Sequence, residues 1–316
     1  MDTSDETRHG QSSLILGIGE LLWDQLPTGA RLGGAPANFT LMAARLGNHA
    51  AVLSRIGRDR LGREAMAVLD PLPVDTGHIG VDAEHETGRV TVAFHNGEPE
   101  YTIHAPAAWD FLEATSDWLQ MAERADAICF GSLAQRSAQS RQAIQTMVAS
   151  SRAECLRVFD VNLRPPCYSA EIVEESLELA TVLKLNETEV PAVLRLLGMA
   201  AVEDGGIEGL RAGAERLLEE FPGLNLVAIT RGAEGSLMVG RKQWNAHPGV
   251  KGNVVDTIGA GDAFTAAMTH ALLRGAPLEV VNRAGNHWGG WVASRAGAMP
   301  DLSDEEFRRI TARVEG

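Results

Sequence analysis

Short apolar runs alternate along the chain with longer segments in which apolar residues recur every three or four positions. The apolar runs have the length and composition of strands buried on both faces of a parallel sheet, and they lie at 13–18, 51–56, 127–130, 156–159, 181–185 and 226–230. The periodic segments have the spacing of helices, and they lie at 39–46, 63–69, 137–150, 210–221 and 278–293, with a further helix that ends at Leu197. Strand and helix in alternation predict an α/β fold, with a mostly parallel central sheet and helices on both faces.

Between residues 88 and 105 the pattern changes to strict alternation of apolar and polar residues. Apolar side chains occupy every second position from Val90 to Phe94, and Asn96-Gly97 is a typical pair for the tight turn of a hairpin. One face of such a hairpin is exposed to water. We expect this hairpin to form, together with the segment 21–32, a small β-sheet lid that stands off the main sheet.

The length of 316 residues allows one large α/β domain or two ordinary ones. Neither a repeat of fixed period nor a linker rich in proline, serine or glycine divides the chain. We therefore expect a single domain over residues 1–316. The hydrophobic content of 45% and the charged content of 22% are those of a soluble globular protein.

Charge and cysteine content exclude several classes of function. A net charge of −14 argues against nucleic acid as a partner, because phosphate backbones are bound by clustered lysine and arginine. A small anionic ligand is compatible with this charge, since a local group of backbone N–H donors binds it regardless of the total. The three cysteines share no CxxC spacing, which indicates neither a zinc site nor a disulfide framework. The segment Met1 to Gln11 is polar and acidic, and no apolar run reaches the ~18 residues of a membrane span, so we expect a cytoplasmic protein without a membrane partner.

The segment from Val254 to Phe264 combines a β-branched run, three small residues and the start of an apolar helix. It predicts a strand to Asp256, a tight turn at Gly259-Ala260-Gly261, and a helix from 263 to 274. A turn of small residues leaves unpaired N–H groups at the helix start, and these groups and the helix dipole favour an anion. Asp262 beside that anion would handle a proton, or alternatively would only cap the helix.

A pair of glycines precedes a helix near the N-terminus. Gly33 and Gly34 allow a ligand to approach the backbone closely, and Asn38 offers both a donor and an acceptor. The alternative for Asn38 is a role as helix N-cap. Further polar residues follow the ends of predicted strands, where a ligand crevice forms in such sheets; they are Glu20, Asp24, Asp160, Asn162, Arg164, Asn186 and Glu189.

Five segments in this order resemble the ribokinase-like family of carbohydrate kinases, also called PfkB-type kinases. The segment Asp256 to Asp262 matches the family's C-terminal signature, and Gly33 to Asn38 matches its N-terminal one. The remaining matches are Phe159 to Arg164, Lys184 to Glu189 and Thr230 to Gly235. The resemblance extends from Gly17 to about Pro300, and within the family it is nearest to the bacterial fructokinases.

The resemblance implies a kinase that transfers the γ-phosphoryl group of ATP to a sugar hydroxyl. Asp262 would be the catalytic base, and Gly259, Ala260 and Gly261 would form the anion hole for the transferring group. The residues implied at the sugar are Asp24, Gly33, Gly34, Asn38 and Arg164. Those implied at the nucleotide are Asn186, Thr230, Gly232, Gly235 and Asn286, and those implied at Mg²⁺ or a neighbouring cation are Glu189 and Asp256.

The residues also fit this chemistry without the family. Phosphoryl transfer requires positioning, charge neutralisation and a carboxylate that accepts the hydroxyl proton. The chain lacks the Walker A sequence GxxxxGK[ST], so phosphate binding rests on the Gly259–Gly261 turn. It also lacks the GxGxxG that a Rossmann-type oxidoreductase requires after its first strand. A non-catalytic sugar- or nucleotide-binding regulator on the same fold is the other alternative, and Asp262 beside the anion hole argues against it.

The sequence favours fructose as the acceptor through the segments Gly33 to Asn38 and Asp160 to Arg164. Kinases for 2-keto-3-deoxygluconate and other sugars share much of both segments, and they are the alternative. Ile258 stands where the family often has a second threonine, near its monovalent-cation site, so we expect weak or absent potassium activation. If the kinase assembles, we expect a homodimer through the exposed lid sheet.

Overall fold

A computed structural model describes residues 12–26, 29–95, 98–200 and 206–316 of the chain. Two segments named above, the Asn96-Gly97 turn and Met1 to Gln11, lie outside these residues. The main sheet has nine strands in the order β13-β12-β11-β10-β9-β8-β1-β4-β5. From β11 to β5 in this order each strand is parallel to its neighbours, whereas β12 and β13 are antiparallel. The predicted mostly parallel α/β sheet is confirmed.

The six predicted apolar runs correspond to β1 (Leu14–Ile18), β4 (His49–Gly57), β8 (Ala127–Gly131), β9 (Leu156–Asp160), β10 (Val182–Asn186) and β11 (Leu226–Thr230). The main sheet also contains β5 (Ile79–Asp82), β12 (Ser236–Gly240) and β13 (Trp244–His247). Side chains alternate between the two faces, so that in β1 Ile15 joins one apolar core while Leu16 and Ile18 join the other.

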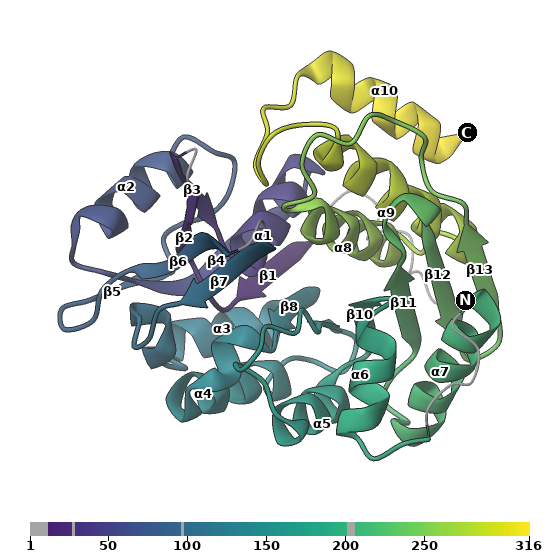
Figure 1. Cartoon of the computed structure of the whole chain (residues 1–316), viewed down its shortest axis with the longest axis horizontal. Coiled ribbons are helices and arrows are strands. Elements are labelled where there is room, and N and C mark those ends of the chain that lie inside the picture. Colours follow the sequence, from purple (N-terminus) through teal and green to yellow (C-terminus); the bar gives the residue numbers. More distant parts are fainter. Residues whose placement is uncertain (1–11, 27–28, 96–97, 201–205) are drawn as a thin grey trace, which may run out of the picture.

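Helices cover both faces of the sheet (Figure 1). One core includes residues of α1 (Ala35–Arg45), α2 (Arg60–Leu69), α8 (Ala260–Leu273), α9 (Leu278–Ala293) and α10 (Asp304–Glu315). The opposite core includes residues of α3 (Ser116–Arg124), α4 (Ala138–Ala149), α5 (Ala170–Leu179), α6 (Glu189–Leu196) and α7 (Ile207–Glu220). Short 3₁₀ helices are η1 (Ala108–Phe111), η2 (Leu133–Arg136) and η3 (Gly232–Glu234).

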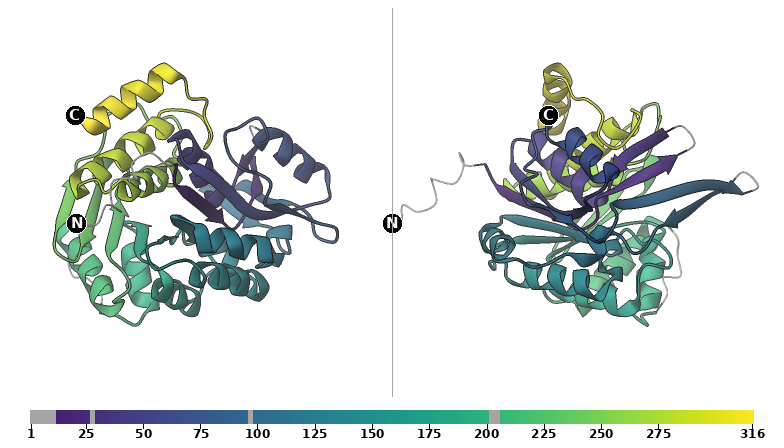
Figure 2. Two further views of the ribbon diagram at one scale, coloured as in Figure 1. Left: turned by 180° about the vertical axis from the view of Figure 1, so that it is seen from behind. Right: turned by 90° about the vertical axis from the view of Figure 1, so that its left-hand side faces the viewer.

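A separate four-stranded sheet has the order β3-β2-β6-β7. Its strands are β2 (Leu22–Leu26), β3 (Gly29–Gly33), β6 (Gly88–His95) and β7 (Glu98–Ile103). The parallel pairing of β2 with β6 joins two antiparallel pairs that are distant in sequence, β2–β3 and β6–β7. The β6–β7 hairpin projects away from the body of the molecule (Figure 2). The small sheet was predicted from the same two segments.

Two local predictions are wrong. The predicted strand at Val254 to Asp256 is an irregular loop, in which Val254 and Val255 are more than half exposed. A β-branched run forms a strand only beside a partner strand, and here the N–H groups of Val255 and Asp256 both donate to the Ala293 carbonyl at the end of α9. Helix α1 begins at Ala35, earlier than predicted, with a proline in its first turn; its N-cap is Gly34, so Asn38 is not a cap.

Three helices and one edge strand were not predicted, namely α3, α5, α10 and β5. The missed helices carry local start signals, because the side chains of Thr115, Ser169 and Ser303 each cap one of them. Ser303 forms a complete capping box with Glu306. A search for caps in addition to apolar period would therefore have found these helices.

Helix α8 packs closely on α9 because two glycines of α9 face it. A methyl group on Gly285 would lie 2.7 Å from the ring of Phe264, and one on Gly289 would lie 3.0 Å from the Ala260 carbonyl oxygen. These glycines thus set the distance between the two helices. Among the described residues, no helix is both long and apolar enough to cross a membrane.

Candidate active site

Asp262 lies in the first turn of α8, after a tight turn at Gly259. Gly259 has φ 77°, a left-handed conformation that favours glycine, and a methyl group there would lie 2.6 Å from Ala298 Cα. Gly259 is the N-cap, and no side chain in the described part of the chain caps this helix. The alternative role of Asp262 as a cap is therefore wrong.

The start of α8 presents free backbone donors. The N–H of Ala260 donates to Thr257 at 3.2 Å, and that of Ala263 donates to Gly259 at 2.9 Å. Within the described part of the chain, the N–H groups of Gly261 and Asp262 have no acceptor. These two donors lie at the positive end of the helix dipole, which is an arrangement that binds an anion.

The Asp262 carboxylate is held by Asn38, whose Nδ2 donates to Oδ2 at 2.7 Å. Burial raises the pKa of Asp262 to about 6, and the negative charge of Asp160 adds to this effect. The hydrogen bond from Asn38 and the positive charges of Lys184 and Arg164 act in the opposite direction. A carboxylate with this pKa is ionised at neutral pH and is more basic than an ordinary aspartate, as a general base requires.

Lys184 and Asp160 form a buried ion pair below the turn. Lys184 Nζ lies 3.0 Å from Asp160 Oδ1, and Thr265 of α8 donates to Asp160 Oδ2 at 2.9 Å. A methyl group on Gly261 would lie 3.1 Å from Lys184 Nζ, so the ammonium group lies directly against the turn. The sequence had assigned Lys184 no role, although a lysine inside the apolar run of β10 was a visible signal.

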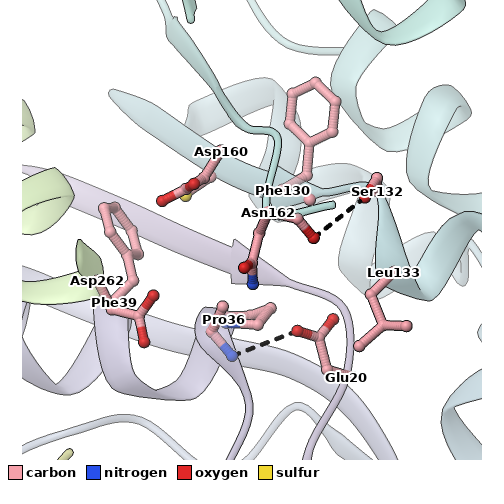
Figure 3. Close-up of a pocket in the computed structure, with 12 residues that line it drawn as sticks. Glu20, Pro36, Phe39, Phe130, Ser132, Leu133, Asp160, Asn162 and Asp262 are labelled. Carbon is pink, nitrogen blue, oxygen red and sulfur yellow. Dashed lines mark hydrogen bonds between the residues drawn. The ribbon is translucent and has the colours of Figure 1, made fainter. Parts of the chain in front are cut away.

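Figure 3 shows a pocket in which Glu20, Asp160, Asn162 and Asp262 lie around a common space. Glu20 is 3% exposed, and its Oε1 accepts the N–H of Ala35 at 3.3 Å. Burial raises the pKa of Glu20 to about 7, and the charge of Asp262 adds to the rise. Among the residues that the structure describes, Glu20 Oε2 has no hydrogen-bond partner, and neither has Asn38 Oδ1. Two buried acceptors in one site indicate a ligand that carries hydrogen-bond donors.

The residues predicted at the sugar lie together on this side of the site. Gly33 leaves space for the Asp24 carboxylate, because a methyl group there would lie 2.6 Å from Asp24 Oδ2. Gly34 has φ 116°, and a methyl group would lie 2.4 Å from the Glu20 carbonyl oxygen. Burial raises the pKa of Asp24, and the charge of the exposed Arg164 lowers it, as it lowers the pKa of Glu20.

Among the residues predicted at the nucleotide and metal, Asn186 ends β10 and Glu189 begins α6. Glu189 is buried and accepts the N–H groups of Leu163 and Asn186, each at 2.8 Å. The Asn186 side-chain oxygen accepts the N–H groups of Thr188 and Glu189. Both side chains thus hold the backbone in place. In the part of the chain that the structure describes, no cluster of three histidine, cysteine or acidic residues could hold a metal ion.

The remaining nucleotide candidates form two groups. Thr230 ends β11, and Gly232 and Gly235 follow in a turn where a methyl group on Gly235 would lie 2.0 Å from the His247 carbonyl oxygen. Asn286 is buried in α9, where its Nδ2 donates to Ser236 at 2.6 Å and to the Asn282 carbonyl at 2.8 Å. Asn286 thus belongs to a buried polar network between α9 and β12.

The Asp256 carboxylate accepts three hydrogen bonds. Its Oδ2 accepts Arg31 Nη1 at 2.8 Å and the N–H of Gly297 at 3.0 Å, and its Oδ1 accepts the N–H of Ile258 at 3.0 Å. Burial acts to raise the pKa of Asp256, but the two backbone donors and the Arg31 guanidinium outweigh it and lower the pKa. Both oxygens of this predicted cation ligand therefore have protein partners.

The sequence matches the pfkB family of carbohydrate kinases over residues 23–305. The chain belongs to this family. Relatives of this pfkB kinase include fructokinase-1 of rice, 29% identical over 94% of this chain and 96% of the relative. They also include the fructokinase of Escherichia coli, 31% identical over 83% of this chain and 85% of the relative.

Solved structures resemble this pfkB kinase over nearly its whole length. A sugar kinase from Pyrococcus horikoshii in complex with ATP is 26% identical, with a TM-score of 0.79 over 95% of this chain and 99% of that one. A fructokinase from Vibrio cholerae with fructose, ADP and calcium is 25% identical, with a TM-score of 0.77 over 96% and 99%. The predicted ribokinase-like fold is confirmed, and the chain is an ATP-dependent carbohydrate kinase.

Proposed function

We propose that this kinase phosphorylates fructose, with Asp262 as the general base. The observation that carries the proposal is the ionisable Asp262 carboxylate beside the free N–H groups of Gly261 and Asp262. A sugar hydroxyl gives its proton to Asp262 while its oxygen bonds to the γ-phosphorus of ATP. The bond from that phosphorus to the β–γ bridging oxygen breaks, and ADP leaves. The free N–H groups and the helix dipole stabilise charge on the transferring phosphoryl oxygens.

The acidic character of the sugar side favours a neutral sugar over a sugar acid. Glu20 Oε2 and Asn38 Oδ1 are buried acceptors without donors, and sugar hydroxyls would supply these donors. The carboxylate of 2-keto-3-deoxygluconate would enter a site that already holds Glu20, Asp24 and Asp262, with the exposed Arg164 as a counter-charge. The fructokinase relatives, and the fructose bound in the Vibrio cholerae structure, support the same choice.

We propose Mg²⁺ as the ion that accompanies ATP and neutralises charge on its phosphates. Glu189, predicted at the metal, and Asn186, predicted at the nucleotide, are both engaged by backbone N–H groups, and among the described residues no acidic cluster forms a metal cage. This fits a magnesium ion held chiefly by phosphate oxygens and water, with few protein ligands.

We further propose that the small sheet covers the sugar and excludes competing water. We also propose that this sheet is the contact surface of a homodimer, which analytical ultracentrifugation would test.

A coupled ATP assay over a panel of acceptors tests the substrate. We expect fructose, or a close ketose, to give the highest kcat/KM among fructose, 2-keto-3-deoxygluconate, ribose and a nucleoside. A strong preference for the nucleoside or for the sugar acid would contradict the proposal.

Asp262→Asn tests the catalytic role. The variant keeps the size of the side chain and should still bind ATP and sugar, while kcat falls on the order of 10²–10⁴-fold through loss of the base. Asp304→Asn is a matched control, because Asp304 is an exposed acidic residue in the first turn of α10. Its activity should equal that of the wild type. If Asp262→Asn keeps more than about a tenth of wild-type kcat, Asp262 is not the base.

A further inference from the structure

Asp256 connects three parts of the molecule that are distant in sequence. Its carboxylate accepts the guanidinium of Arg31, which lies 225 positions away on β3 of the small sheet. It also accepts the N–H of Ile258 in its own loop and the N–H of Gly297 in the loop after α9. The loop that leads to the Gly259 turn is therefore fixed from three sides at Asp256.

The surroundings of Asp256 favour a positive charge. The N–H groups of Val255 and Asp256 both donate to the carbonyl of Ala293, the last residue of α9, so the loop lies at the negative end of that helix. A carboxylate and a helix C-terminus at one place together favour a cation. A guanidinium is always charged and is less strongly hydrated than an ammonium, so it suits a partly buried position.

Arg31 occupies this position in the structure. Its Nη1 lies 2.8 Å from Asp256 Oδ2, and the Asp256 side chain is 18% exposed. A methyl group on Gly297 would lie 3.7 Å from Arg31 Nη1, so the guanidinium also lies against the loop after α9. That loop in turn contacts the anion-hole turn, because Ala298 lies directly against Gly259.

We propose that Arg31 is a tethered monovalent cation that positions the anion-hole turn. Its guanidinium neutralises Asp256 and holds the loop 255–259, so the kinase needs no free monovalent cation for full activity. Arg31 is a positioning residue, since it acts through Asp256 and touches no reacting atom. The proposal rests on the proposed role of the Gly261 and Asp262 N–H groups as the phosphoryl site. With this role, Arg31 would cause the weak potassium activation that the sequence predicted from Ile258 in place of threonine.

The experiment compares potassium chloride with tetramethylammonium chloride at equal ionic strength. For the wild type, Arg31→Ala and a control, it measures kcat and, by calorimetry, the affinity for a non-hydrolysable ATP analogue. Arg211→Ala is the control, because Arg211 lies on α7 outside the proposed site, its side chain is 32% exposed against 39% for Arg31, and its ion pair with Glu208 has the same length of 2.8 Å.

We expect the wild type and Arg211→Ala to have the same kcat and analogue affinity in both salts. Arg31→Ala should lose at least about tenfold in kcat in tetramethylammonium, the equivalent of one charge-assisted hydrogen bond. Potassium or guanidinium chloride should restore most of this loss, which they would not do if Arg31 only stabilised the fold. The affinity of Arg31→Ala for the analogue should show the same cation dependence.

Three results would overturn the proposal. They are activation of the wild type by potassium, an Arg31→Ala variant as active as the wild type in both salts, and a loss in Arg31→Ala that no cation restores. The calorimetric measurement does not depend on the sugar. If no sugar is phosphorylated but the analogue affinity of Arg31→Ala follows the cation, the proposed substrate fails and the role of Arg31 stands.

Discussion

Replacement of Glu20 by glutamine should stabilise the protein at alkaline pH. Glu20 is 3% exposed, with one carboxyl oxygen bonded to the N–H of Ala35 and the other without a partner. Glutamine keeps an oxygen that accepts from Ala35 and has the shape of the protonated acid. It carries no charge, so the cost of a buried carboxylate disappears.

The magnitude follows from the pKa of Glu20, which burial raises from 4.5 to about 7. The folded state then holds the Glu20 proton more tightly than the unfolded state. The contribution of this proton to the free energy of unfolding is therefore fully present below pH 4.5 and is lost as the pH rises through about 7. At about 1.4 kcal/mol per pKa unit, the total loss is about 3 kcal/mol. As the pH rises from about 5.5 to about 8.5, the free energy of unfolding of Glu20→Gln should increase by about 2 kcal/mol relative to that of the wild type.

Urea unfolding at several pH values, followed by tryptophan fluorescence, measures this difference in free energy of unfolding. Glu64→Gln is the control, because the Glu64 side chain on α2 is 45% exposed and pairs with Arg60. Its difference from the wild type should not change over the same range. If the difference for Glu20→Gln is equally independent of pH, the buried carboxyl of Glu20 does not have a raised pKa.

Two further predictions concern the reaction. Because Asp262 must be ionised to accept the proton and burial raises its pKa to about 6, kcat/KM should fall about tenfold per pH unit below that value; a profile that is flat down to pH of about 5 would contradict this. Asn38→Ala should raise the sugar KM by the equivalent of about 1–3 kcal/mol with little change in ATP affinity, since it removes a buried hydrogen-bonding group from the proposed sugar site. It should also move the acid limb of the pH profile to higher pH, because the Asn38 hydrogen bond lowers the pKa of Asp262; lost stability with an unaltered sugar KM would assign Asn38 a purely structural role.

The sequence predicted those features that are encoded locally. The strands were found because buried parallel strands are continuous apolar runs, and the turn before Asp262 was found because three small residues lie together. The strand at Val254 was wrong because a strand also needs a neighbour, which no local pattern contains.

The missed site residues depend on contacts between distant segments. In the sequence Lys184 is a charged residue within an apolar run, and only the fold shows its contacts with Asp160 and the Gly261 turn. Arg31 is one arginine among many in the sequence, and only the fold places it on Asp256. Glu20 was noticed at a strand end, but the absence of a partner for its Oε2 is visible only in three dimensions.

The glycine contact between α8 and α9 has a consequence for engineering of the enzyme. Phe264 lies two residues after Asp262 on the same helix, and a methyl group on Gly285 would lie 2.7 Å from its ring. An alanine at 285 must therefore shift the ring or move α8 as a rigid unit, and a displacement of about 1 Å at a reacting group can cost on the order of 10²-fold in rate. A substitution at position 285 should therefore change turnover, although no residue of α9 lines the pocket in Figure 3. Libraries that vary only the pocket wall would miss it.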